Sequence, residues 1–307
     1  MKINNLKIYF YVLVILVIIV FIVICIRTKS PQYHFISGNV KQGTICKNAK
    51  TDFIVRKLQR KIIRSIRRGT ATHISIFYKD LDCNISFEIN GKEMYAPASL
   101  MKVPTLLAYY KQLELRSNIS SNKLMFDKNL FRSTEYFPPK KAVQIGKTYE
   151  MDDLVKRMIM YSDNQAAELV MFALGETYLN QSDAALGLPT TYTSENFMTV
   201  NKIGKIFETL YDSSYLNQQN SEAALQLLSK TDFHYGIVAG VPKKVIISHK
   251  FGERENSEGV QLHDCGIVYV PKHPYIFCIM TKGKDMKVLM NVIKNISKTF
   301  YKNFTAK

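Results

Sequence analysis

Tyr95-Ala-Pro-Ala-Ser-Leu-Met-Lys-Val-Pro-Thr-Leu-Leu-Ala-Tyr-Tyr110 is the stretch around which this chain is organised. Ser99 and Lys102 stand three residues apart, where an apolar helix is predicted to begin. Residues i and i+3 share one face of a helix, so the Lys102 amine can reach the Ser99 hydroxyl. A lysine beside a serine is one way to activate a nucleophile without histidine. The spacing alone is weak, because Ser120 and Lys123 repeat it in a polar stretch.

Strands are predicted on both sides of a long helical region. Upstream of Ser99, alternating apolar and polar residues predict a hairpin that leads directly into the Ser99 helix. Residues 105–215 have a helical pattern, and a final amphipathic helix is predicted over 285–304. The predicted strands cover residues 73–79, 85–89, 244–250, 266–270 and 275–281. We therefore expect an α+β fold: one antiparallel sheet flanked by the N- and C-terminal helices, plus an all-helical lobe.

One continuous apolar run lies near the N-terminus. Residues 8–26 are apolar throughout, and about 19 helical residues span the core of a bilayer. A cleaved signal peptide is the alternative, because a basic segment precedes the run, but the run is long and no small-residue cleavage site follows it. We expect a short tail over residues 1–7, a transmembrane anchor over 8–26, a tether over 27–50 and a catalytic domain over 51–307.

The formal net charge is +17, and much of it lies in residues 56–68. Leu58, Ile62 and Ile66 recur there at helical spacing, so the basic residues occupy the other faces of a helix. A solvated basic face is the favoured interpretation. The alternative is contact with anionic lipid or a cell-wall polymer. Nucleic acid is not an expected partner, because no recognisable binding motif is present.

The cysteines and histidines give no metal-binding pattern. No C-x-x-C occurs, and the six histidines lack ligand spacing, so neither a metal nor another cofactor is expected. Cys265 and Cys278 lie in apolar, strand-like segments and are expected to be buried thiols. A bridge between Cys46 and Cys83 is possible in an oxidising compartment, but the sequence leaves the connectivity open.

Three motifs follow one another along the chain: Ser99-Leu-Met-Lys102, Ser162-Asp-Asn164 and Lys250-Phe-Gly252. In this order, at a helix start, a helix end and a strand, they resemble the motifs of the serine β-lactamase and penicillin-binding protein superfamily. Within it, they are similar to the class A β-lactamases. The resemblance covers about residues 70–305, and the combination is far more specific than any one motif.

The resemblance implies that Ser99 is the catalytic nucleophile and forms an acyl-enzyme. Lys102 would take or relay its proton, helped by a neighbouring cation such as Lys250 that lowers the pKa of Lys102. Ser162 would pass the proton to the leaving nitrogen. On its own, Ser162 would be interpreted as a helix-capping residue, since serine favours helix ends.

The resemblance also implies where substrate binds. The Asn164 amide would bind a substrate amide and hold Lys102, although on its own Asn164 would also be interpreted as a helix cap. The backbone N–H groups of Ser99 and Glu253 would form the oxyanion hole. The substrate-binding residues implied in this way are Asn164, Lys250, Gly252 and Glu253.

Two features depart from the family pattern. Phe251 stands where the family has a hydroxyl residue that helps bind the substrate carboxylate, and Arg254 is one candidate to replace it. The loop that carries the deacylating glutamate in class A enzymes is short here, spanning residues 187–199. Glu195 is its only carboxylate and could position the deacylating water. The alternative for Glu195 is an ordinary surface residue.

The expected function is therefore that of a membrane-anchored serine hydrolase of the class A β-lactamase type, acting on β-lactams or D-Ala-type peptides of peptidoglycan. Such chemistry places the catalytic domain outside the cell, on a single-pass protein of the cell membrane. One alternative is a penicillin-binding peptidase or transpeptidase with slow deacylation. Another is a catalytically silent cell-wall-binding or sensor domain on the same scaffold.

Overall fold

The computed structural model describes residues 35–36, 48–83, 85–130, 135–189, 197–257, 259–271 and 273–306. One compact unit extends from Phe35 to Lys307. The predicted anchor, residues 8–26, lies outside the described residues. Among the helices that are described, none is both long enough and apolar enough to span a membrane.

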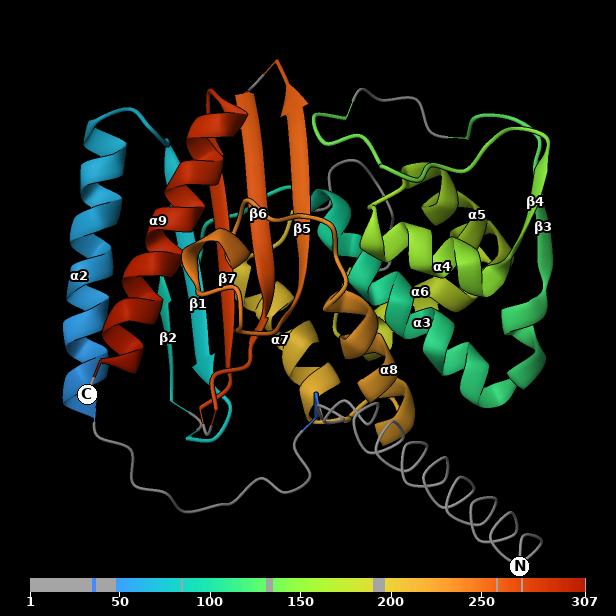
Figure 1. The fold of residues 1–307 in the computed structure, drawn as a ribbon, viewed down its shortest axis with the longest axis horizontal. Helices are drawn as coiled ribbons and strands as arrows, with labels where there is room; N and C mark the ends of the chain where they lie inside the picture. Colours follow the sequence, from blue (N-terminus) through green and yellow to red (C-terminus); the bar gives the residue numbers. More distant parts are fainter. Residues whose placement is uncertain are drawn as a thin grey trace, which may run out of the picture. The chain divides into compact units, whose positions relative to one another are not determined.

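A five-stranded antiparallel sheet forms the centre of the unit, in the order β2-β1-β7-β6-β5 (Figure 1). The prediction that the first and last strands join in one sheet is confirmed, because β1 pairs with β7 from His73 opposite Lys282 to Asp80 opposite Tyr275. Both faces of β7 are buried, which agrees with its continuous apolar sequence. The strands are β1 (His73–Asp80), β2 (Ser86–Ile89), β5 (Ile247–Asn256), β6 (Gly259–Val268) and β7 (Tyr275–Gly283).

The predicted bounds of β5 and β6 were wrong. The two strands form one long hairpin in which Phe251 lies opposite Asp264 and Asn256 lies opposite Gly259. The predicted strands 244–250 and 266–270 cover only the apolar half of this hairpin. Its other half is polar because β5 is an edge strand, where backbone pairing with β6 needs no alternating apolar pattern. The third motif therefore lies in the middle of a strand and not at its end.

The N- and C-terminal helices, α2 (Asn48–Arg67) and α9 (Met286–Thr305), cover one face of the sheet, as predicted (Figure 1). Leu58 and Ile62 of α2 are buried there together with Leu289 and Ile293 of α9. Ile66, which follows at the same helical spacing, is 42% exposed and lines a pocket beside His73 and Ile74 of β1. The basic residues of α2 lie mainly on its exposed side.

The helical block packs against the other face of the sheet, through α7 (Val200–Tyr211) against β1 and β7. A cluster of buried apolar side chains joins the two layers; Phe35, ahead of α2, belongs to it. The remaining helices of the block are α3 (Lys102–Leu115), α4 (Met151–Met160), α5 (Asn164–Leu174), α6 (Glu176–Ala185) and α8 (Gln218–Leu228). Short 3-10 turns occur at η1 (Ala98–Met101), η2 (Ser117–Ser121) and η3 (Val238–Gly240).

The block also contains a two-stranded sheet that the helical pattern did not predict. It is formed by β3 (Lys123–Phe126) and β4 (Lys147–Glu150), with Lys123 opposite Glu150. Each strand has only four residues, and most of their side chains are exposed. Such short, solvated strands carry too little apolar alternation to be recognised from sequence.

The cysteine predictions have different outcomes. Cys265 and Cys278 face each other across β6 and β7, and both are buried free thiols, as predicted. Cys83 is disulfide-bonded. Its partner lies outside the described residues, so the pairing of Cys83 with Cys46, which the sequence left open, stays open.

Candidate active site

Ser99 lies in the 3-10 turn η1, immediately before α3. The preceding residue, Ala98, has a φ of 50°, which is unfavourable for a residue with a Cβ and indicates a backbone held under strain. Neighbouring contacts hold this segment: Tyr95 forms a backbone bridge to Met198, and the Ala96 carbonyl contacts Nε2 of His263 at 3.0 Å. Ser99 itself is only half-buried. The Ser99 side chain is therefore held by a constrained backbone and stays partly exposed.

His263 supports this turn only as a neutral imidazole. Its Nδ1 accepts a hydrogen bond from the backbone N–H of Thr281 at 3.2 Å, so the proton is on Nε2, which faces the Ala96 carbonyl. Burial lowers the pKa of His263 from 6.5 to about 4. The folded protein therefore binds this proton less readily than the unfolded chain, and stability is lost as pH falls from the unfolded pKa towards the folded one.

From this shift we expect His263 to account for about 2 kcal/mol of lost stability between pH 7 and pH 5. Urea unfolding of the wild type and of His263→Gln at both pH values measures it. Glutamine keeps an N–H donor but does not titrate. The variant should be less stable than the wild type at pH 7, and its free energy of unfolding should fall less between pH 7 and pH 5. An equal loss in both proteins would contradict this role.

Lys102 is the first residue of α3 and is 6% exposed. Its Nζ donates to Oγ of Ser99 at 2.9 Å and to the carbonyl of Ser162 at 2.6 Å. It also contacts Oδ1 of Asn164. Burial lowers the pKa of Lys102 to about 8, against the opposing effect of nearby carboxylates. A lysine with this pKa is partly neutral near physiological pH and is able to accept the Ser99 proton.

Ser162 lies between α4 and α5, and Asn164 is the first residue of α5. Asp163 caps α5, accepting hydrogen bonds from the backbone N–H groups of Gln165 and Ala166. The other oxygen of Asp163 accepts from the N–H of Val143 at 2.8 Å. Ser162 has a φ of 58°, a second strained non-glycine position. The helix cap thus belongs to Asp163, and it leaves the side chains of Ser162 and Asn164 directed towards Lys102.

Lys250 completes the constellation from β5. Its fully buried Nζ donates to Oγ of Ser162 at 2.9 Å and to the carbonyl of Phe251 at 3.0 Å. Burial, followed by the charge of Lys102, lowers the pKa of Lys250 well below its ordinary value. The charge of Lys250 was expected to lower the pKa of Lys102. This expected cause was wrong, because burial is the main reason for the lowered pKa of Lys102. The Ser162 hydroxyl lies between the two amines and can carry a proton between them.

Gly252 allows β5 to lie directly against the Ser99 turn. A Cβ at this position would lie 2.4 Å from the Pro97 carbonyl oxygen, closer than any side chain tolerates. The next residue, Glu253, has its side chain directed across the cleft, where one carboxylate oxygen accepts the Phe137 N–H at 3.0 Å. The close approach of η1 and β5 is what an oxyanion hole built from the amides of Ser99 and Glu253 requires.

Phe251 is 5% exposed and takes part in an aromatic cluster. Its ring stacks on Phe233 with centroids 4.1 Å apart, and Phe137 packs edge-on against it. Nζ of Lys250 lies 4.1 Å from the centroid of the Phe251 ring. The position that carries a hydroxyl in the family is therefore filled by hydrocarbon, which does not donate a hydrogen bond to a substrate carboxylate.

Glu135 lies against Asn164, and no sequence pattern pointed to it. One of its carboxylate oxygens accepts a hydrogen bond from Nδ2 of Asn164. Burial raises the pKa of Glu135, while the charge of Lys102 opposes that shift. Glu135 is followed in the chain by two aromatic residues and a proline pair, with no motif that would bring it to the cleft. Only the long-range contact reveals it.

Glu195 lies outside the described residues, within 190–196, so its assignment to deacylation stays a prediction. The described ends of the connection are Pro189 and Phe197, between α6 and α7. Met198 then pairs with Tyr95, which ties the end of this connection to the segment that leads to Ser99.

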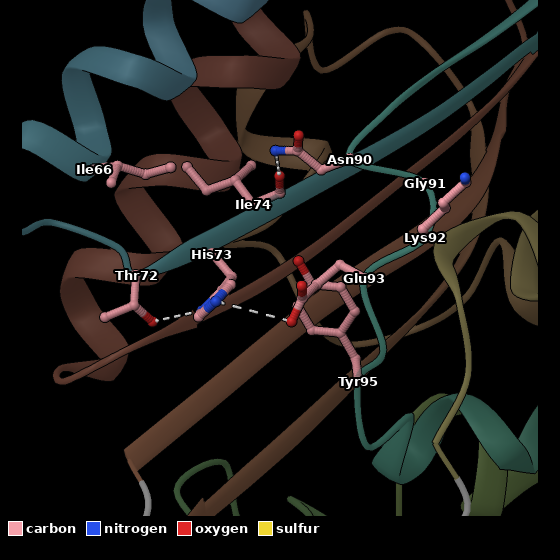
Figure 2. Close-up of a pocket in the computed structure, with 9 residues that line it drawn as sticks. All are labelled: Ile66, Thr72, His73, Ile74, Asn90, Gly91, Lys92, Glu93 and Tyr95. Carbon is pink, nitrogen blue, oxygen red and sulfur yellow. Dashed lines mark hydrogen bonds and ion pairs between the residues drawn. The ribbon is translucent and has the colours of Figure 1, made fainter.

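A separate pocket of about 520 Å³ lies where the end of α2 meets the start of β1 and the segment leading to Ser99 (Figure 2). Nε2 of His73 lies 3.9 Å from a carboxylate oxygen of Glu93 there, and Lys282 forms an ion pair with the same oxygen at 2.7 Å. None of the three motifs lines this pocket. The reactive groups are gathered at Ser99 and not here.

One further cluster has the residue types of a metal site. Potential ligand atoms of Asp80, Cys83 and His273 lie within 4.8 Å of one another. However, Cys83 is disulfide-bonded and has no thiolate to offer. One oxygen of Asp80 already accepts the backbone N–H groups of Asp82 and Cys83. These contacts describe a capped turn, so we do not assign a metal to it.

A serine hydroxyl bonded to a buried lysine, with a second lysine linked to the first through another serine, is an arrangement able to activate the serine of a serine hydrolase. The comparisons agree with this class. Residues 57–304 match the Beta-lactamase enzyme family, and the chain belongs to that family. It is thereby placed in the serine β-lactamase and penicillin-binding superfamily. No curated protein sequence matches the chain.

Solved structures share the fold. PBP-A is 22% identical, with a TM-score of 0.69, over 81% of this chain and 96% of its own. A β-lactamase from Chitinophaga pinensis is 15% identical, with a TM-score of 0.71, over 82% of this chain and 100% of its own. The extended-spectrum β-lactamase TLA-3 is 18% identical, with a TM-score of 0.71, over 82% and 99%. At these identities the similarity concerns the fold alone.

Proposed function

We propose that the protein forms an acyl-enzyme at Ser99 with β-lactams or D-Ala-type peptides, in the manner of class A β-lactamases. The observation that carries the proposal is the hydrogen bond of 2.9 Å between Nζ of Lys102 and Oγ of Ser99. The lowered pKa of that lysine supports it. A PBP-A mutant has been described as an acyl-enzyme complex with penicillin G, which supports the same chemistry on this fold.

The acylation step follows from the contacts. Lys102 takes the proton as Oγ of Ser99 attacks the carbonyl carbon, and the N–H groups of Ser99 and Glu253 stabilise the resulting oxyanion. The C–N bond then breaks, and the leaving nitrogen receives a proton from Ser162. Lys102 restores the Ser162 proton through their contact of 3.2 Å. Lys250 holds the Ser162 hydroxyl from the other side.

Substrate recognition is proposed to differ from that of the family at one end of the cleft. Phe251 offers an apolar ring where a hydroxyl would bind the carboxylate, so recognition of that group falls to Lys250 or Arg254. At the other end, a substrate amide must displace Glu135 from Nδ2 of Asn164 before it can bind there. Glu195 remains the proposed deacylating residue of the short loop, and Gly252 a proposed substrate-binding residue.

A penicillin-binding peptidase with slow deacylation is the second candidate. It is favoured by the short connection between Ala185, where α6 ends, and Val200, where α7 begins. Fast deacylation requires a positioned base and water, and the sequence of this connection holds a single carboxylate, Glu195. A silent wall-binding domain is disfavoured, because binding alone gives no reason to bury two amines beside a serine.

Incubating the ectodomain with a chromogenic cephalosporin and with penicillin G distinguishes these candidates. Turnover that depends on Ser99 supports a β-lactamase, and a persistent adduct on Ser99 supports a penicillin-binding peptidase. A D-Ala-D-Ala peptide tests the peptidase directly. If none of these compounds reacts in a Ser99-dependent way, both enzymatic functions are rejected.

We also propose that residues 8–26 anchor the protein in the cell membrane with the catalytic domain outside. The apolar run supports this, and the disulfide at Cys83 agrees with an oxidising compartment. The exposed basic residues of α2 support contact with anionic lipid or wall polymer. Fractionation of expressing cells, with and without residues 1–26, tests the anchor. Release of the full chain by a salt or carbonate wash would contradict it.

A further inference from the structure

Four carboxylates lie close enough to Lys102 to raise its pKa: Glu135, Asp163, Glu253 and Glu168. Asp163 accepts hydrogen bonds from three backbone N–H groups. Glu135 accepts from the Asn164 amide, and one oxygen of Glu253 accepts from the Phe137 N–H. Three of the four therefore accept hydrogen bonds from groups around Lys102, although Oε2 of Glu253 is buried without a partner among the described residues.

Glu168 differs from the other three. In the part of the chain that the structure describes, its carboxylate makes no hydrogen bond or ion pair. It lies on α5, four residues after Asn164, and so shares the helix face from which Asn164 reaches Lys102. Its side chain is half-buried.

Further along α5, the side chains on this face are exposed to solvent. Phe172, one further turn along, is 79% exposed. Water therefore has access to the Glu168 carboxylate along this face, while Lys102 lies at its inner end. Burial raises the pKa of Glu168 and the charge of Lys102 lowers it, so the carboxylate is a better proton acceptor than an exposed one while Lys102 favours its ionised form.

We propose that Glu168 is the general base that activates water to hydrolyse the Ser99 acyl-enzyme. The proposal rests on the proposed function, since it needs an acyl group on Ser99. Among the four carboxylates near Lys102, Glu168 is the one with neither oxygen engaged in a hydrogen bond to the described residues, whereas the unpartnered oxygen of Glu253 is buried. Glu168 lies on α5, four residues after Asn164, so the helix fixes the position of its carboxylate relative to Ser99. The short loop over residues 187–199 then does not have to provide the base.

Hydrolysis of the Ser99 acyl-enzyme begins with Glu168. Glu168 removes a proton from water while the water oxygen bonds to the acyl carbonyl carbon, and the N–H groups of Ser99 and Glu253 hold the oxyanion. The tetrahedral intermediate collapses by breaking the bond from the carbonyl carbon to Oγ of Ser99. After acylation Lys102 is neutral, so Glu168 passes the proton that it took from water to Lys102 through a second water molecule, and Lys102 gives that proton to Oγ. The product leaves as a carboxylic acid, which loses its remaining proton to solvent.

The test separates acylation from deacylation in the wild type and in Glu168→Gln. Stopped-flow mixing with a chromogenic cephalosporin gives the acylation rate, and intact-protein mass spectrometry after a penicillin G pulse gives the lifetime of the adduct. Glutamine keeps the shape of the side chain but accepts no proton. We expect acylation to change by less than about threefold, and the adduct to last at least about a hundredfold longer. The deacylation rate of the wild type should also fall at acidic pH, and that fall should disappear in the variant.

Two matched variants serve as controls. Glu176→Gln changes an exposed glutamate in the first turn of α6 and should leave both rates as in the wild type. Glu195→Gln tests the carboxylate of the short loop. If Glu195→Gln prolongs the adduct while Glu168→Gln does not, the assignment to Glu168 is wrong.

The remaining outcomes are also decisive. Equal slowing of acylation and deacylation in Glu168→Gln would mean that Glu168 acts through Lys102, which overturns its role as the base. A wild-type adduct as persistent as that of Glu168→Gln also overturns it, but leaves acylation of Ser99 standing. Absence of any Ser99 adduct in the wild type rejects the proposed function itself.

Discussion

Replacing Lys102 by methionine is expected to slow acylation of Ser99 by about a thousandfold, within the range found for loss of a general base. Methionine has a similar length and no charge, so it removes the proton acceptor without opening a large cavity. The burial that lowers the pKa of Lys102 to about 8 adds a second expectation. Acylation by the wild type should accelerate as pH rises towards 8, and that acceleration should be absent in Lys102→Met.

A suitable control is Lys123→Met, because Lys123 has the same sequence spacing to Ser120 as Lys102 has to Ser99. Lys123 is exposed and lies on β3, so its replacement should not affect acylation. The measurement is the pre-steady-state rate of acylation by a chromogenic cephalosporin between pH 6 and pH 9. An acylation rate in Lys102→Met within tenfold of the wild type would show that another group removes the proton.

Replacing Gly252 by alanine is expected to reduce acylation by about a hundredfold, because a misplacement of about 1 Å has effects of that size. The new Cβ would lie 2.4 Å from the Pro97 carbonyl oxygen and 3.2 Å from the backbone nitrogen of Leu100. Both atoms belong to the Ser99 turn, so β5 and the nucleophile must move apart. The strain should also cost about 1–3 kcal/mol of stability, as overpacking does elsewhere.

Gly91→Ala provides the comparison for Gly252→Ala. Its Cβ would meet the exposed, flexible side chain of Glu88, which can move away at little cost. We expect near-normal stability and acylation for this variant. Thermal unfolding and acylation rates of both variants check the pair. If Gly252→Ala acylates as fast as Gly91→Ala, the close approach of β5 to the Ser99 turn is not needed for the reaction.

The site was predictable where the chemistry is carried by short, ordered motifs. The spacing of Ser99 and Lys102 became meaningful because Ser162 and Lys250 follow in the right order, and the structure brings these four side chains together. The repeated spacing at Ser120 and Lys123 did not acquire such partners. Ser120 lies in η2 and Lys123 in the strand β3, whereas the turn that holds Ser99, η1, continues directly into the helix that Lys102 begins, α3.

Other features of the structure could not be predicted from the sequence, for physical reasons that can be named. The end of β5, from Glu253 to Asn256, has no apolar alternation, so that strand was predicted too short. In β6, the short alternation of Val260 and Leu262 around Gln261 was missed. Glu135 reaches Asn164 across 29 positions of the chain, a contact that local patterns do not encode. Glu168 lies on a helix that was predicted, but its lack of partners and its proximity to Lys102 appear only when the neighbouring carboxylates have been placed.

The cause of the lowered pKa of Lys102 was also out of reach. Charge counting suggested repulsion from Lys250, whereas burial is the larger effect. Burial depends on the packing of η1, α5 and β5 around one amine, and the order of motifs carries no information on how tightly these elements close. The chemistry of the motifs was therefore clearer from sequence than the energetics of the site.

The most direct test of the account is the mass of the protein after reaction with penicillin G. The predicted result is an increase by the mass of one penicillin molecule, carried by the peptide that contains Ser99 and absent from Ser99→Ala. Quenching at short times captures the adduct even if deacylation is fast. No mass increase at any time, together with no Ser99-dependent consumption of penicillin, would contradict the central claim, as would an adduct that survives in Ser99→Ala.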